Sequence, residues 1–108
     1  MLTFEKVLEV FRDYLAEDRC CEVVKTSRGY AVLGWDECRE IWYSIENAPT
    51  PEALRDILAD CYYGYMAYKV TKGYEHDDPT EQEEQEIQEK CCALLERCRD
   101  NGGGENDL

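Results

Sequence analysis

Residues 49–72 read PTPEALRDILADCYYGYMAYKVTK, and this stretch organises the rest of the chain. Thr50 can cap a helix, and Pro51 suits the first helical position. Apolar side chains then recur at helical spacing and predict an amphipathic helix that continues through Tyr68; they are Leu54, Ile57, Leu58 and Cys61. Gly64 costs such a helix about 1 kcal/mol relative to alanine. We therefore expect either close packing at Gly64 or an early end to the helix, with a strand after Gly64 as the less favoured alternative.

A first helix is predicted at the start of the chain. Thr3 is its cap, and the helical pattern continues to about Asp18. One face of this helix is apolar and consists of Phe4, Val7, Leu8, Phe11, Tyr14 and Leu15.

A last helix is predicted after a polar loop. Asp78 serves as its cap, Pro79 takes the first helical position, and Glu81 reaches back as in a capping box. Its apolar row begins late and consists of Ile87, Cys91, Leu94, Leu95 and Cys98. We expect the helix to end near Asn101, because three glycines follow it.

Between the first two helices the apolar period changes from helical to strand-like. Three short runs, residues 21–24, 30–35 and 39–46, are separated by turn signals and predict an antiparallel meander. A helix over residues 36–47 is the competing interpretation, because Cys38, Ile41, Trp42 and Ile45 also fit helical spacing. The strand is favoured over that helix.

The predicted order of elements is α-β-β-β-α-α. It describes an α+β fold in which a small three-stranded antiparallel β-meander is packed on one face by helices. Residues 1–101 are expected to form a single domain, and residues 102–108 a disordered C-terminal tail.

The alternation of side chains along the third predicted strand, residues 39–46, indicates which aromatic side chains are exposed to a binding partner. Side chains alternate between the two faces of a strand, so Trp42 lies on the outer face if its alternating neighbours face the helices. Those neighbours are Ile41, Tyr43 and Ile45. Tyr30 and Val32 are expected on the same outer face as Trp42.

Charge and composition exclude several classes of partner. The chain has 108 residues and a net charge of −13, and residues 75–108 alone hold 12 acidic and 3 basic side chains. The Lys and Arg residues form no basic stripe, so we expect no direct nucleic-acid binding and no membrane binding. The N-terminus lacks a signal-peptide pattern, and no apolar run approaches the ~20 residues of a membrane helix. A cytoplasmic protein is therefore expected.

The chemistry-bearing residues favour neither an enzyme nor a metal or cofactor site. Seven cysteines without a secretion signal indicate reduced thiols that fill the core. A zinc site across the fold is the weaker interpretation, because Cys-x-x-Cys spacing is absent; it would combine Cys91 or Cys92 and Cys98 with Cys20 or Cys21. His76 is the only histidine and falls in the polar loop, which leaves a cysteine nucleophile without a base.

The tyrosines after Asp60 divide into two groups. Tyr62 and Tyr65 continue the apolar row of their helix and are expected in the core or at its rim. Tyr63 falls off that row and is expected to be exposed, while Tyr68 fits either position.

These features predict a small acidic protein that acts by binding another protein, or a second copy of itself, without catalysis. The candidate partner-binding residues are Trp42, Tyr30, Tyr63 and Tyr68. The first alternative is an acidic inhibitor that mimics nucleic acid in the basic groove of a nucleic-acid-binding protein. Its candidate acidic face consists of Glu81, Glu83, Glu84 and Glu86. The second alternative is a cysteine-based metal or redox protein.

Overall fold

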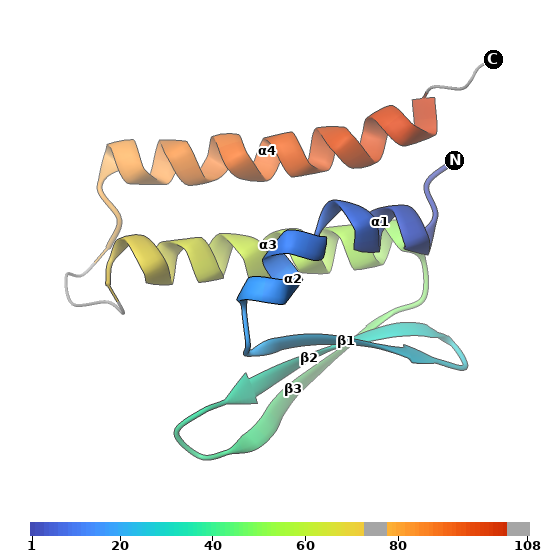
Figure 1. The fold of residues 1–108 in the computed structure, drawn as a ribbon, viewed down its shortest axis with the longest axis horizontal. Helices are drawn as coiled ribbons and strands as arrows, with labels where there is room; N and C mark the ends of the chain where they lie inside the picture. Colours follow the sequence, from blue (N-terminus) through green and yellow to red (C-terminus); the bar gives the residue numbers. More distant parts are fainter. Residues whose placement is uncertain (73–77, 104–108) are drawn as a thin grey trace.

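The computed structural model describes residues 1–72 and 78–103, with side chains described up to residue 99. Its elements, labelled in Figure 1, are α1 (Phe4–Val10), α2 (Arg12–Glu17), β1 (Cys21–Thr26), β2 (Gly29–Asp36), β3 (Ile41–Ala48), α3 (Pro51–Val70) and α4 (Glu81–Gly103). The strands form one antiparallel sheet in the order β1-β2-β3. The predicted α+β class and three-stranded meander are therefore confirmed, and β3 confirms the strand over the competing helix.

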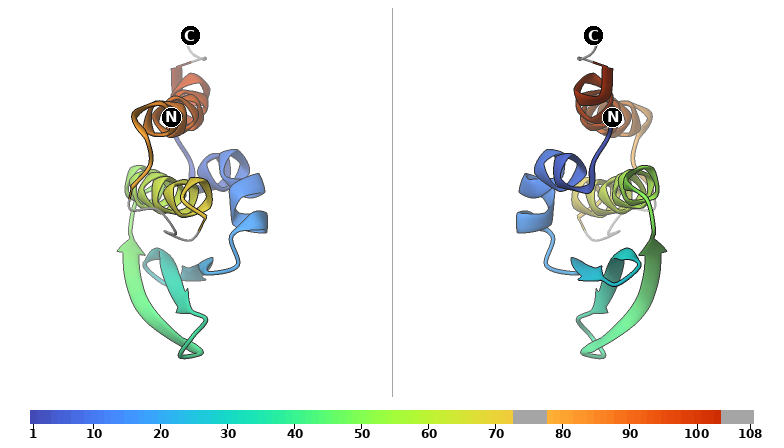
Figure 2. Two further views of the ribbon diagram at one scale, coloured as in Figure 1. Left: turned by 90° about the vertical axis from the view of Figure 1, so that its left-hand side faces the viewer. Right: turned by 90° about the vertical axis from the view of Figure 1, so that its right-hand side faces the viewer.

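The elements lie in three tiers. Figure 1 and Figure 2 show α4 lying along α3, with α1 and α2 beside α3 and the sheet on the opposite side from α4. The core lies between these tiers, and its fully buried members include Val7, Phe11, Leu54 and Leu58. The helices therefore cover one face of the sheet, which we call the inner face; the other is the outer face.

The predicted first helix is divided in two at Phe11. Its backbone there has φ −94° and ψ 9°, outside the helical range, although the Phe11 N–H still donates to the Val7 carbonyl at 3.1 Å. Phe11 is fully buried and Tyr14 is only 5% exposed. Phe11, between the two helices, and Tyr14 of α2 thus both contribute large aromatic side chains to the core.

The structure confirms the helix predicted to begin after Thr50, which is α3. The Thr50 hydroxyl accepts from the Ala53 N–H at 3.1 Å, and Pro51 occupies the first turn. The two explanations offered for Gly64 are both wrong, because the helix continues to Val70 and a Cβ at Gly64 would meet no atom within 4 Å.

The cap of α4 lies two residues later than predicted. The Thr80 hydroxyl accepts from the Glu83 N–H at 3.1 Å, and the Glu83 carboxylate accepts from the Thr80 N–H at 2.8 Å. This is a reciprocal capping box, and it displaces Asp78 and Glu81 from the roles predicted for them. The helix continues to Gly103 instead of ending near Asn101. Residues 104–108, which make up most of the predicted tail, lie outside the described residues.

A bulge between β2 and β3 changes which side chains share a face. Gly34 pairs with Ser44, but the next residue, Trp35, pairs with Trp42, so Tyr43 has no partner in β2. An extra residue of this kind shifts the alternation of faces along the strand. A Cβ on Gly34 would lie 3.0 Å from the Tyr43 ring, so the absence of that atom makes room for the bulge.

The register overturns part of the predicted assignment of faces. Val32 is buried in the core, so the inner face holds Val32 and Tyr30, and both were expected on the outer face. Leu33 pairs with Ile45, which places Ile45 on the outer face and not toward the helices as predicted. Trp42 lies on the outer face, as predicted, through its pairing with Trp35.

Candidate interaction surface

The exposed large apolar side chains of the described residues are concentrated on β3. Four of them lie within five consecutive positions: Ile41, Trp42, Tyr43 and Ile45 are exposed by 42%, 45%, 62% and 66%. We call these four residues the β3 patch. Ile41, Tyr43 and Ile45 were predicted to face the helices. Ile45 lies on the outer face instead, and Ile41 and Tyr43 are exposed.

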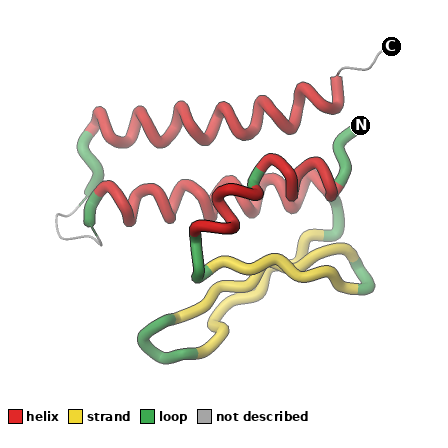
Figure 3. The backbone as a smooth tube through the Cα atoms, viewed as in Figure 1, coloured by secondary structure: helices red, strands yellow, loops and turns green. Residues whose placement is uncertain are grey.

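The β3 patch is exposed because the β2–β3 hairpin extends beyond the helices. Figure 2 shows the turn of this hairpin as the part of the sheet farthest from the helical tiers, and Figure 3 shows its loop at the far corner of the sheet. The bulge then distributes the patch over both faces. Trp42 and Ile45 lie on the outer face, whereas the Tyr43 ring lies against Gly34 on the other.

The edge of β3 adds backbone groups to this apolar surface. The strand is hydrogen-bonded to β2 on one side only, because it is the last strand of the sheet. An edge strand presents unpaired N–H and C=O groups that can pair with a strand of another chain. Natural edge strands commonly carry charges that discourage such pairing. Residues 41–45, IWYSI, carry none.

Two features hold the hairpin in one conformation. The Trp35 and Trp42 rings meet edge to face with centroids 4.8 Å apart. The Asp36 carboxylate accepts from the N–H groups of Cys38 and Arg39 at 2.9 and 3.1 Å, which closes the loop before β3. The patch is therefore a preorganised strand and not a flexible segment that must order on binding.

The other aromatic candidates occupy different surroundings. The Tyr30 ring packs against Phe4 with centroids 4.8 Å apart, and the Lys25 ammonium lies 5.2 Å from its centroid. Tyr30 thus belongs to the packing between α1 and the inner face of the sheet. Tyr68 on α3 is 53% exposed.

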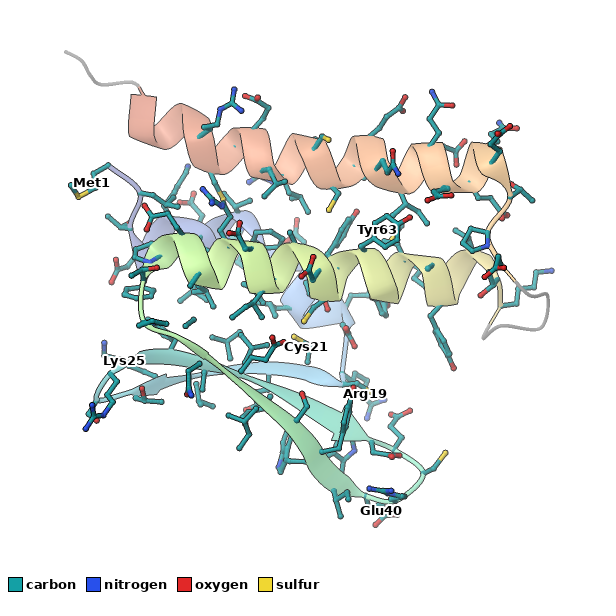
Figure 4. All side chains as sticks on the ribbon, turned by 180° about the vertical axis from the view of Figure 1, so that it is seen from behind. Met1, Arg19, Cys21, Lys25, Glu40 and Tyr63 are labelled. Carbon is teal, nitrogen blue, oxygen red and sulfur yellow. The ribbon has the colours of Figure 1, made fainter. Side chains whose placement is uncertain are left out.

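Tyr63 was predicted to be exposed, and the structure shows it half-buried between α3 and α4. Its hydroxyl donates to the Glu84 carboxylate at 3.0 Å, and this hydrogen bond raises the pKa of Tyr63. Its position on α3, separate from the side chains that face the sheet, is visible in Figure 4. Tyr63 therefore joins two helices of the same chain.

Tyr62 and Tyr65 lie at the rim of the core, as predicted. Their rings pack against Tyr14 of α2, with centroid distances of 5.5 and 5.6 Å. The Tyr65 hydroxyl donates to Glu17 at 2.8 Å, and burial together with this hydrogen bond raises the pKa of Tyr65 to about 12.

A shallow pocket of about 270 Å³ lies beside these tyrosines, between α2, α3 and α4. Its charged groups neutralise one another in part, because Lys69 Nζ lies 2.6 Å from the Glu17 carboxylate. The hydrogen bonds from Lys69 and Tyr65 lower the pKa of Glu17. The pocket is smaller than the ~300 Å³ at which ligand sites usually begin, so we assign it no ligand.

The candidate acidic residues do not form one free row. Glu83 is half-buried and caps α4, and Glu84 accepts from Tyr63. Glu81 and Glu86 are exposed.

The cysteines are free thiols, and no group of three or more His, Cys, Asp or Glu in the described residues could hold a metal ion. The predicted packing role of Cys91 and Cys98 is confirmed. Cys98 belongs to the core and is 1% exposed. Cys91 packs against the core, and the Cys91 Sγ lies 3.6 Å from the Ala59 carbonyl oxygen. His76 and its neighbours in residues 73–77 lie outside the described residues.

Sequence reasoning therefore found Trp42 but missed its three neighbours on β3. The only signal for the bulge was Gly34 beside Trp35, because a glycine inside a strand often marks such an irregularity.

Comparison of the chain with protein families, curated proteins and solved structures finds no match to any of them. Among the helices of the described residues, none combines the length and the apolar character that a membrane crossing requires.

Proposed function

We propose that this chain is a non-catalytic protein-interaction module that binds through the β3 patch, and that its partner is a second copy of itself. The observation that supports the proposal is the run of exposed apolar side chains on an uncharged edge strand. The proposal places the protein in the cytoplasm, where seven free thiols stay reduced.

Pairing of two β3 strands suits this surface better than contact through one face. The patch extends over both faces of the sheet, so a strand added alongside β3 covers side chains on both. Antiparallel pairing of the β3 strands of two copies would join the two three-stranded sheets into a single six-stranded sheet. The unpaired backbone groups along the β3 edge of each copy would then find hydrogen-bond partners. The arrangement has twofold symmetry and closes after two copies.

The distribution of charge favours the sheet as the contact between two copies. Residues 21–48 hold five acidic and three basic side chains, a balance of −2, so most of the net charge of −13 lies outside the sheet. Glu40 and Glu46 flank the patch. In an antiparallel register centred on Ser44, Glu40 faces Ala48 and Glu46 faces Trp42 of the other copy, which avoids a destabilising like-charge contact.

Light scattering after size-exclusion chromatography tests the proposal across a concentration series at low and at moderate salt. We expect the mass to rise from one chain to two with concentration, and to do so more readily at moderate salt. Salt screens the repulsion between two strongly acidic copies and leaves burial of apolar surface intact. A single-chain mass at high micromolar concentration in both salts would overturn self-association.

Two matched variants locate the contact. Ile45→Lys adds a positive charge, which reduces the repulsion between copies, so loss of the dimer in this variant must come from the lost apolar contact. Tyr68→Lys makes the same kind of change at an exposed residue of α3 and is expected to leave the dimer intact. Equal effects of the two variants would remove β3 from the proposal.

The acidic inhibitor makes the opposite prediction for salt. Capture of a basic partner by carboxylates weakens between low and moderate salt. Two of the four acidic candidates already serve contacts within the chain, which favours the β3 patch.

A further inference from the structure

The sheet has a second free edge, which runs along β1 on the opposite side from β3. The Trp35 N–H donates to the Cys20 carbonyl at 2.9 Å, and the residues that exchange hydrogen bonds in an antiparallel pair alternate along each strand. The N–H and C=O groups of Val23 and Lys25 therefore point away from β2. Within the described residues, no backbone hydrogen bond reaches these groups from the open side.

A pocket lies along this edge, between β1 and the helices α1 and α2. Its volume is about 410 Å³, above the ~300 Å³ at which ligand sites usually begin. Leu8 and Leu15 line it from the helices, and Val23 lines it from β1. Figure 2 shows α1 and α2 on the β1 side of the sheet, with β3 on the other side.

The register of β1 fixes which residue of an added strand enters this pocket. Val23 pairs with Val32, whose side chain is buried in the core, so Val23 also lies on the inner face. A residue directly opposite Val23 on an added strand would share that face and place its side chain in the pocket. The two neighbours of that residue would lie on the outer face.

The charges at the pocket indicate which side chains suit those neighbouring positions. Among the described residues that line the pocket, Asp18 and Glu22 are negatively charged and Arg19 is positively charged. Asp18 already accepts from the Tyr14 hydroxyl at 2.6 Å. Glu22 is exposed, and its pairing with Leu33 places it on the outer face. Opposite charges that face each other across two strands stabilise the pair, and the net charge of −13 adds attraction for a cationic partner.

We propose that the β1 edge binds an extended segment of a partner protein in which apolar and basic side chains alternate. The segment adds an antiparallel strand to the sheet, and its N–H and C=O groups pair with those of Val23. An apolar side chain enters the pocket, and a neighbouring Lys or Arg faces Glu22. This proposal does not rest on the β3 patch, because pairing of two β3 strands leaves the β1 edges free at the ends of the six-stranded sheet.

Isothermal titration calorimetry with synthetic peptides tests the proposal on the wild-type protein. The probe has the sequence VKLKV with both termini blocked, and VELEV is its oppositely charged counterpart. We expect the probe to bind at least about fivefold more tightly than VELEV, with a smaller difference at higher salt. No binding of the probe, or equal binding of the two peptides at low salt, would overturn the proposal.

A third peptide separates strand addition from unspecific attraction to an acidic protein. Methylation of the backbone nitrogen of the central leucine in VKLKV keeps every side chain and charge. It removes the N–H that pairs with the Val23 carbonyl, so binding is expected to weaken by at least about fivefold. Equal binding of the methylated and unmethylated peptides would overturn the proposal. This comparison needs only the wild-type protein, so it stays decisive if a variant fails to fold.

Two matched variants locate the contact. Glu22→Lys and Glu81→Lys make the same change of charge at exposed residues, on β1 and on α4. Glu22→Lys is expected to lose most of the preference for VKLKV over VELEV, whereas Glu81→Lys retains it. Equal loss in both variants would show that only the net charge matters, and would overturn the proposal. If Glu22→Lys instead lowers the mass of the protein in light scattering and leaves peptide binding unchanged, the edge binds a second copy of the chain and the proposal is wrong.

Discussion

At the scale of single residues, two glycines show how backbone conformation and neighbouring atoms determine whether replacement by alanine stabilises or destabilises the fold. Gly29, the first residue of β2, has φ +118°, and a Cβ there would lie 2.6 Å from the Ala48 carbonyl oxygen. Gly64 lies inside α3, and a Cβ there would meet nothing within 4 Å. Gly29 is therefore required by the hairpin, whereas Gly64 only weakens a helix.

We expect Gly29→Ala to lower the free energy of unfolding by at least about 2 kcal/mol, because it combines backbone strain with a steric clash. Gly64→Ala serves as its matched control and is expected to raise that free energy by about 0.5–1 kcal/mol. Urea unfolding followed by circular dichroism measures both values. A gain in Gly29→Ala, or a loss in Gly64→Ala, would contradict this account of the two sites.

At the scale of elements, polar contacts between helices supplement the apolar packing. Glu17 of α2 accepts from Tyr65 and Lys69 of α3 at 2.8 and 2.6 Å, and Tyr63 of α3 donates to Glu84 of α4. Each contact joins residues that are far apart in the sequence. The side-chain partners of these tyrosines could therefore not be read from their own helix.

The contact of Glu17 predicts a dependence of stability on pH. Its pKa in the folded protein lies below the ordinary value of 4.5, so its contribution is present above pH 4.5 and is lost as the pH falls below that value. We expect Glu17→Gln to lower the urea midpoint at pH 7 and to have a smaller effect below the folded pKa. Lys69→Gln is expected to remove much of the difference between the two pH values. A Glu17→Gln effect that is the same at both would contradict the assignment.

At the scale of the whole molecule, the β3 patch lies on the hairpin that extends farthest from the helical tiers. The proposed contact between two copies is therefore made by the sheet, and the acidic helix α4 of each copy lies outside it.

Local patterns were sufficient to predict most of the elements. Helical spacing predicted α3 and the face of α1 and α2 that enters the core, and the cap Thr50 was identified at its position. The cap of α4 was misplaced because two overlapping patterns compete there. Asp78 and Thr80 both precede acidic residues, and the threonine forms the reciprocal bonds. The two capping residues differ little in free energy, so the start of the helix can shift by two residues without a change in the rest of the fold.

The sequence by itself determined the class of fold, the order of the elements and the concentration of negative charge in residues 75–108, because these follow from periodicity and composition along the chain. Only the tertiary structure decided the exposure of the β3 patch and the inward position of Tyr30. The physical reason is register. One unpaired residue at Tyr43 reverses the face of the residues after it, and contacts between distant segments depend on how the strands and helices align.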